Sequence, residues 1–196
     1  MLSGVILAGG AHRGMKGDNR AFLVVDGQTL IERQIREMKT CCSEITIVTN
    51  EPQLFLKTVD RDIRIITDYY AGKGLLSGMH AGLALAKNRH VWLLGCHLPS
   101  PSAQAAKLQL SYMQEGTDAV LPFIKETVYP LHGIYDRSNA ERIGRLLDGG
   151  ITDVSLFLRQ INRTQLAESH FEEQGINREF VRSIHTQGDF RNSATL

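Results

Sequence analysis

The chain has 196 residues, a length that fits one α/β domain with a sizeable core. Hydrophobic residues make up 42% of it, which excludes an intrinsically disordered protein. A formal net charge of +1 predicts neither nucleic acid nor a membrane as a partner, so any anion must be bound by local groups.

Apolar strand patterns alternate with amphipathic helix patterns through the first half of the chain. The predicted elements are, in order, a strand at Val5–Ala8, a helix at Leu30–Met38 capped by Thr29, a strand at Glu44–Thr49, a helix at Pro52–Thr58, a strand at Ile63–Thr67, a helix at Leu75–Lys87, a strand at Val91–Cys96 and a helix from Pro99 to about Glu115. The run Val91–Cys96 is typical of a central strand covered on both faces. This order predicts a parallel sheet with right-handed crossovers.

The second half of the chain is less regular. Strands are predicted at Asp118–Phe123, Val128–Tyr135, Thr164–Ala167 and Val181–His185, and helices at Ala140–Leu147 and Val154–Gln160. We interpret residues 1–196 as one mixed α/β domain. Residues 1–100 are its nucleotide-binding half, and residues 101–196 are its acceptor-binding half.

A glycine-rich loop follows the first predicted strand. Gly9 and Gly10 turn the chain, and Arg13, Lys16 and Arg20 bring three positive charges close together. The spacing matches neither the phosphate loop G-x-x-x-x-G-K-[ST] nor the dinucleotide fingerprint G-x-G-x-x-G. One interpretation is a tight turn without further function. The other is a phosphate cradle, which the cations favour because like charges repel unless an anion lies among them.

The cysteine spacing predicts neither a disulfide framework nor a zinc site. Cys41, Cys42 and Cys96 are therefore interpreted as reduced thiols. The N-terminal residues lack the basic segment and the long apolar core of a signal peptide, and no apolar run is long enough to cross a bilayer. The sequence predicts a cytoplasmic protein.

Several motifs stand in a definite order along the chain. The first is Leu7-Ala-Gly-Gly10, at the start of the glycine loop, and the cationic part of the loop then leads into Arg20–Arg33. The others are Ile47–Asn50, Ile66–Asp68, Gly72–Gly78, Ala81–Leu83, Leu93–Pro99, Tyr129–Tyr135, Val154–Leu158 and Ser183–Thr186. Together they resemble the molybdenum cofactor guanylyltransferases, GT-A-like nucleotidyltransferases, over nearly the whole chain. The resemblance implies a Rossmann-like, three-layer α/β/α sandwich with a mostly parallel, mixed central sheet.

The resemblance also implies an activity and a set of site residues. Such enzymes transfer GMP from GTP to the phosphate of molybdopterin and release pyrophosphate. The implied metal cofactor is Mg²⁺, with Mn²⁺ as the alternative, and the implied protein partners are molybdoenzymes or cofactor-delivery proteins. The implied nucleotide-binding residues are Leu7, Ala8, Gly9, Gly10, Arg13, Lys16, Arg20, Asn50, Asp68, Gly74 and Gly78. Arg20 and His97 are the implied catalytic residues, His97 also stands at the metal position, and the acceptor would contact His132, Ser183 and His185.

Three motifs depart from the family's pattern. The family's loop reads L-A-G-G-x-x-x-R-M-G-x-x-K, whereas here Gly14 replaces the Arg and Lys16 replaces the Gly. Arg20 stands in place of the Lys, one residue later than this spacing gives. The family's C-D-x-P is Cys96-His97-Leu98-Pro99 here, which exchanges a carboxylate for an imidazole. The family's N-x-N-T is Ser183-Ile-His-Thr186 here.

Three interpretations of His97 follow from these departures. In the first, the metal site is weakened and turnover is slow. In the second, another carboxylate such as Asp68 or Asp136 takes the metal. In the third, a protonated His97 itself contacts the phosphates. Its predicted place at the carboxyl end of a central strand favours a role in ligand binding. Two further functions stay open: a weakly catalytic relative that binds nucleotide or cofactor and acts in delivery, and a nucleotidyltransferase with another NTP and acceptor.

Overall fold

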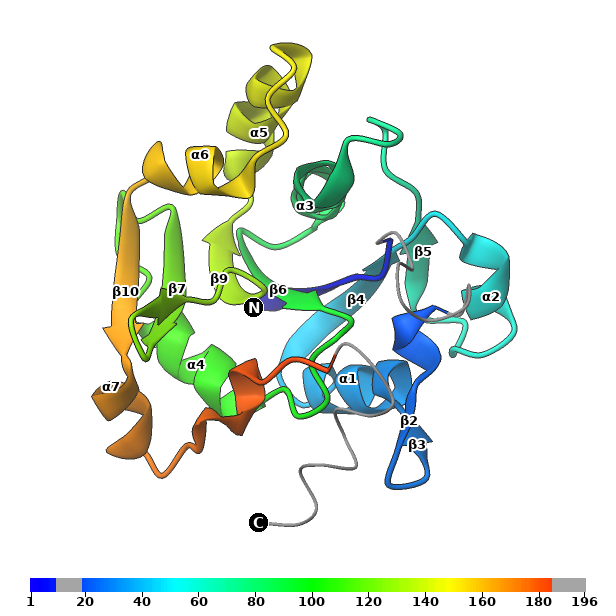
Figure 1. The fold of residues 1–196 in the computed structure, drawn as a ribbon, viewed down its shortest axis with the longest axis horizontal. Helices are drawn as coiled ribbons and strands as arrows, with labels where there is room; N and C mark the ends of the chain where they lie inside the picture. Colours follow the sequence, from blue (N-terminus) through cyan, green and yellow to red (C-terminus); the bar gives the residue numbers. More distant parts are fainter. Residues whose placement is uncertain (10–18, 185–196) are drawn as a thin grey trace.

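One eight-stranded sheet runs through the middle of the molecule (Figure 1). The computed structural model describes residues 1–9 and 19–184. The strands of this sheet are β1 (Leu2–Leu7), β4 (Cys42–Val48), β5 (Arg64–Ile66), β6 (His90–Gly95), β7 (Ala119–Ile124), β8 (Thr127–Val128), β9 (His132–Asp136) and β10 (Arg163–Ala167). A separate short hairpin consists of β2 (Val24–Val25) and β3 (Gln28–Thr29).

The strands are arranged in the order β10-β7-β9-β6-β1-β4-β5, and β8 pairs with β7. β6, β1, β4 and β5 are mutually parallel, and β10 is parallel to β7. β9 is antiparallel to both of its neighbours, β6 and β7. The predicted mixed, mostly parallel sheet is confirmed, and residues 91–95 of the predicted strand Val91–Cys96 form most of its central strand, β6.

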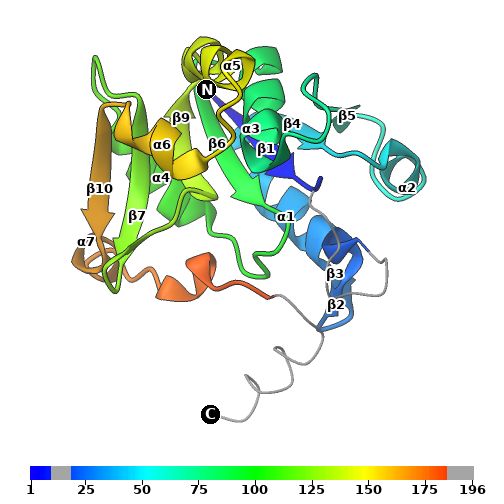
Figure 2. The same ribbon diagram turned by 45° about the horizontal axis from the view of Figure 1, so that its top comes forward.

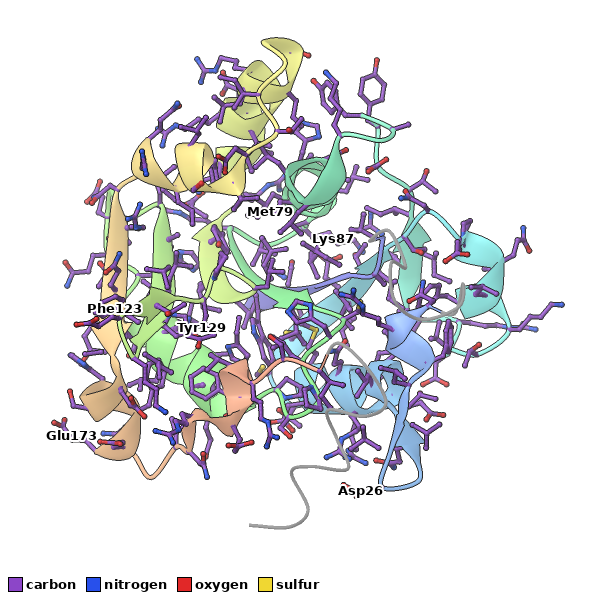
Figure 3. All side chains as sticks on the ribbon, viewed as in Figure 1. Asp26, Met79, Lys87, Phe123, Tyr129 and Glu173 are labelled. Carbon is purple, nitrogen blue, oxygen red and sulfur yellow. The ribbon has the colours of Figure 1, made fainter. Side chains whose placement is uncertain are left out.

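Helices cover both faces of the sheet (Figures 1 and 2). One face carries α3 (Gly74–Leu85), α5 (Asn139–Asp148) and α6 (Val154–Arg159), and the other carries α1 (Leu30–Met38) and α4 (Ala103–Ser111). Met79 points from α3 toward the sheet, where it is fully buried with Val5 (Figure 3). Ile6, the next residue of β1, is buried with Met38 on the opposite face. Successive residues of β1 therefore fill two separate cores, and the predicted three-layer sandwich is confirmed.

Two short helices, α2 (Pro52–Leu56) and α7 (Glu168–Glu172), lie toward opposite edges of the sheet. The remaining short elements are the 3-10 helices η1 (Arg20–Phe22) and η2 (Arg178–Val181). No helix within residues 1–9 and 19–184 has the length and apolar character needed to span a bilayer.

The helix predicted at Leu30–Met38 is confirmed at both ends. Thr29 accepts a hydrogen bond from the Glu32 N–H, and the Glu32 carboxylate accepts one from the Thr29 N–H. This capping box stabilises the first turn because it supplies partners for two backbone donors. Along the helix, Leu30, Ile31 and Met38 are completely buried.

Two predicted strands differ from the structure. The strand predicted at Val128–Tyr135 is interrupted between β8 and β9, at Pro130, which has no N–H to donate to a ladder. The strand predicted at Val181–His185 is wrong over its described part: Val181 ends η2, and residues 182–184 have no regular structure. The Asn177 side chain caps η2 by accepting a bond from the Glu179 N–H.

The contact between α3 and β1 gives a test of the packing. A Cβ at Gly82 would lie 2.5 Å from Cγ1 of Val5, which is fully buried in the strand and cannot move aside. We expect Gly82→Ala to destabilise the protein by about 1–3 kcal/mol through overpacking.

The matched control is Gly78→Ala on the same helix. Its Cβ would lie 3.6 Å from Cδ2 of Leu7, an ordinary contact, so the gain in helix propensity of up to about 1 kcal/mol is kept. Urea unfolding of both variants measures the difference. Equal stability of the two would contradict the close approach of α3 to β1.

Candidate functional site

A well-formed cleft lies at the carboxyl ends of the parallel strands. It has a volume of about 330 Å³, which is within the range of small-molecule sites. From β1 the chain continues to β4 and β5 on one side, and then crosses back to β6 on the other. The strand order therefore reverses between β1 and β6, and such a switch point is where open α/β sheets bind ligands.

The cleft gathers most of the residues that the sequence predicts for nucleotide binding and catalysis. Those in its lining are Leu7, Ala8, Gly9, Arg20, Asn50, Asp68, Gly74, Gly78 and His97. Gly10, Arg13, Lys16 and His185 lie outside the described residues. Six further lining residues were not predicted: Asn19, Val48, Thr49, Leu75, Cys96 and Leu131.

Hydrogen bonds fix the chain where it leaves β1. The Ala8 carbonyl accepts bonds from Nδ2 of Asn19, at 3.2 Å, and from Oγ1 of Thr49, at 3.3 Å. Nδ2 of Asn50 donates to the Gly9 carbonyl at 3.2 Å. Side chains from the end of β4 and from just before η1 thus hold the last described residues before the glycine loop in one position.

Asn19 also positions Arg20. Its side chain is buried and caps η1 by accepting a bond from the Ala21 N–H at 3.1 Å. Within the described part of the chain, Nε of Arg20 is buried and has no hydrogen-bond partner. Burial raises the pKa of the Cys96 thiol to about 11, and the positive charge of Arg20 works against that rise. The guanidinium therefore lies near the end of β6.

The N-terminus of α3 forms another part of the wall. Gly74, Leu75 and Gly78 line the cleft, and among the described residues no side-chain cap is formed at the first turn of this twelve-residue helix. The first N–H groups of such a helix carry partial positive charge and lack intrahelical partners, which suits an anionic or polar ligand. Lys73 is directed elsewhere, since its Nζ donates to the Leu147 carbonyl at 2.7 Å.

The turn that carries His97 is held from several sides. Backbone N–H groups of Gly95 and Cys96 donate to the carbonyls of Leu131 and Leu7, respectively. The fully buried side chain of Gln34, on α1, donates through Nε2 to the carbonyls of Gly95, at 3.1 Å, and Leu98, at 2.8 Å. These bonds come from three different parts of the chain, so the turn has little freedom to move.

The imidazole of His97 packs directly against Gly95. A Cβ at Gly95 would overlap Cε1 of the ring, lie 2.8 Å from Nδ1 and come within 3.1 Å of Cδ1 of Leu131. Glycine at this position is thus required for the observed ring placement.

A second, smaller cavity of about 110 Å³ adjoins the same turn. His97 and Leu131 line both cavities. Ser183, which the sequence predicts as an acceptor contact, lines the smaller cavity together with Tyr129, which is labelled in Figure 3. The Ile184 N–H donates to the His97 carbonyl at 2.9 Å, so the segment after η2 is tied to the turn.

His132 contributes to the wall of the smaller cavity, but its side chain is fully buried. Its Nε2 accepts a bond from the Ser102 N–H at 3.2 Å, and its Nδ1 lies 3.3 Å from Oε1 of Gln109. Burial lowers the pKa of His132 to about 3, so the ring is neutral. Both ring nitrogens are engaged by the protein. The His132 ring therefore supports the wall of the smaller cavity, and its predicted contact with the acceptor stays a prediction.

Asp136 does not belong to the site. It is paired with His90 across β9 and β6, which places it at the opposite edge of the sheet, about 20 Å from His97 by strand length. Its carboxylate accepts bonds from Nε of Arg89 and from the Ser138 N–H. The interpretation that Asp136 takes the metal is therefore wrong.

The described residues do not fit a protein-held Mg²⁺ ion. Asp68 is the one carboxylate among the described residues that line the two cavities. Nowhere in residues 1–9 and 19–184 do three His, Cys, Asp or Glu side chains come together as metal ligands. An ion that requires a nearly octahedral shell of oxygens would have to take most of its ligands from elsewhere.

Known proteins resemble this chain in sequence and in fold. Residues 4–164 match the family described as the MobA-like NTP transferase domain. The molybdenum cofactor guanylyltransferase of Desulfosudis oleivorans is 34% identical over 149 residues, which are 76% of this chain and 72% of that protein.

Two solved structures have the same fold. Molybdopterin-guanine dinucleotide biosynthesis protein A from Archaeoglobus fulgidus superposes with a TM-score of 0.80 at 21% identity, covering 97% of this chain and 96% of that one. Rv0371c from Mycobacterium tuberculosis, in complex with manganese, superposes with a TM-score of 0.63 at 14% identity, covering 85% and 87% of the two chains. With a switch-point cleft of nucleotide size and a family match over most of its length, the chain belongs to the MobA-like NTP transferase family and is a nucleotidyltransferase similar to molybdenum cofactor guanylyltransferases.

Proposed function

We propose that this protein transfers GMP from GTP to the phosphate of molybdopterin and releases pyrophosphate. The observation that carries this proposal is the pair of cavities that meet at His97 and Leu131. A transferase of two substrates needs two adjacent subsites with a shared boundary at the reacting atoms. Residues from both predicted halves of the chain form that boundary. We place the reaction in the cytoplasm. Cys41, Cys42 and Cys96 are free thiols in the structure, and a reducing compartment keeps thiols in that state.

GTP occupies the larger cavity in this proposal. Asn50 and Asp68 contact the guanosine, and the backbone of Ala8 and Gly9 together with Arg20 contacts the phosphates. Gly74 and Gly78 give the nucleotide close access to the start of α3. The acceptor enters through the smaller cavity, past Ser183, so that its phosphate reaches the nucleotide beside His97.

The reaction is an in-line displacement at phosphorus. An oxygen of the acceptor phosphate forms a bond to the α-phosphorus of GTP. The bond from that phosphorus to the oxygen bridging to the β-phosphate breaks, and pyrophosphate leaves with the electron pair. The attacking oxygen is already anionic, so no general base is required. Positioning and charge neutralisation supply the rate, as in other phosphoryl transfers.

A second candidate function is binding without efficient transfer. In this case the protein binds nucleotide or cofactor and passes it to a molybdoenzyme or a cofactor-delivery protein. The observation that favours it is the single carboxylate among the described lining residues of the two cavities.

Transfer of label from [α-³²P]GTP to purified molybdopterin tests the first function. We expect a labelled pterin dinucleotide and one pyrophosphate per turnover. Arg20→Met is expected to lower kcat/KM by about 100-fold or more, because it removes a charge that stabilises the transition state, and Arg20→Lys is expected to recover part of the loss. Tight GTP binding by a folded protein without any label transfer would favour the second function instead.

Gly95→Ala tests the placement of His97. Its methyl group would occupy the position of the ring, so we expect the transfer rate to fall by at least about 10-fold through misplacement of the side chain. Gly149→Ala is the matched control, since its Cβ would meet its nearest neighbour at 3.4 Å and lies outside the site. Single-turnover assays and thermal melts measure both variants.

The double variant Gly95→Ala, His97→Ala separates this effect from general damage. If Gly95 acts only through His97, adding His97→Ala to Gly95→Ala should cost little more. Fully additive losses in rate would argue against that link.

A further inference from the structure

Charge is distributed unevenly along the larger cavity. Asp68 follows β5, whereas His97 follows β6, and β4 and β1 lie between these two strands. Three strand spacings separate them, a distance of about 14 Å across the sheet. A single ion cannot be bound by side chains at both ends. The end next to His97, where the two cavities meet, therefore has no carboxylate among the described lining residues.

That same end contains hydrogen-bond donors with positive or neutral charge. Arg20 and Cys96 line the larger cavity together, and His97, which also lines it, is the next residue after Cys96. Within the described residues, Nε of Arg20 is buried without a partner, and a buried guanidinium nitrogen left unpaired is costly. A phosphate oxygen is the partner that a planar guanidinium fork best accommodates.

The imidazole is held in place before any ligand arrives. Gln34 fixes the turn through two hydrogen bonds, and the bare Cα of Gly95 provides the surface on which the ring lies. A preorganised donor does not have to be reoriented when charge develops next to it. The His97 ring has a defined position that depends on Gly95, because any larger residue at position 95 would displace the ring. We therefore do not interpret His97 as a merely tolerated substitution at a strand end.

We infer that Arg20 and His97 bind the nucleotide's phosphates in place of a protein-held divalent cation, so that this chain binds a triphosphate equally well with and without Mg²⁺. The inference rests on the proposed function for the choice of GTP as the nucleotide. It concerns binding by the protein, and Mg²⁺ that travels with the free nucleotide is not needed for the contact.

Isothermal titration of the full chain tests the inference with three probes, GTP, ATP and inorganic tripolyphosphate, each in EDTA and in excess Mg²⁺. We expect the Kd in EDTA to lie within about threefold of the Kd in Mg²⁺ for GTP and for tripolyphosphate. Binding of GTP or tripolyphosphate only in Mg²⁺ would overturn the inference and leave the use of GTP intact. Metal-independent binding of tripolyphosphate with no preference for GTP over ATP would overturn the guanine specificity of the proposed function and support the inference.

Substitutions at position 97 supply the second readout. His97→Asp should weaken binding in EDTA by about 30-fold or more, since it sets a carboxylate against the phosphates, and Mg²⁺ should restore most of the affinity. His97→Asn keeps a donor without charge and should lose less in EDTA. His170→Asp, on α7 and remote from the cavities, is the matched control and should bind as the unmodified chain does. Unchanged EDTA binding by His97→Asp, in a protein with an unchanged melting temperature, would overturn the inference.

Discussion

The structure depends on how the chain leaves the central strand. At the end of β6 the backbone bonds to Leu7 on one side and to Leu131 on the other, and Gln34 bonds to the turn from the helix layer. These contacts join the parallel half of the sheet to the antiparallel strand β9 at one point. The two cavities meet at this turn, because His97 and Leu131 line both of them.

Buried amides and imidazoles make this junction rigid. Gln109 donates through Nε2 to the carbonyls of Val120 and His132, and its Oε1 faces His132, whose other nitrogen bonds the Ser102 N–H at the start of α4. Each of these polar groups would be costly to bury alone, and each has a partner. The network therefore orders the wall of the smaller cavity and the helix that follows the His97 turn in a single arrangement.

Local sequence patterns predicted a helix or strand well where residues within or next to that element determine where it begins and ends. Leu30–Met38 is an example, because Thr29 and Glu32 form its cap and the apolar period continues to Met38. The hydrophobic pattern did not predict elements whose conformation is determined by tertiary contacts. The two-residue strands β2 and β3 and the five-residue α7 are too short to show a period. The strand predicted at Val181–His185 overlaps η2 only at Val181, which is buried in a cluster with Phe171 and Phe180.

The same distinction applies to the site. Arg20, Asn50, Asp68 and His97 follow strand ends or the glycine loop, so the carboxyl-edge rule for α/β sheets brings them together. Leu131 and Gln34 carry no such signal: a leucine in a connecting segment and a glutamine within an amphipathic helix acquire their roles only from long-range pairing. Asp136 was misplaced because the sequence did not reveal that β9 is antiparallel, which sends its last residue to the other edge.

Among the described lining residues of the cleft, the separation of opposite charges favours one orientation of a bound nucleotide over the reverse. Arg20 and His97 lie toward β6, and Asp68 lies beyond β4 at the end of β5. A nucleotide that binds with its phosphates toward β6 brings its base toward a carboxylate, which can only accept hydrogen bonds when ionised. Guanine presents N–H donors on its Watson–Crick edge, including the N2 amino group, whereas adenine presents an acceptor at the corresponding ring nitrogen. The reversed orientation would place phosphates against Asp68 and is opposed by like-charge repulsion. In the proposed binding mode, Asp68 therefore favours guanine over adenine at the end of the cleft opposite Arg20 and His97, where the described lining residues include no carboxylate.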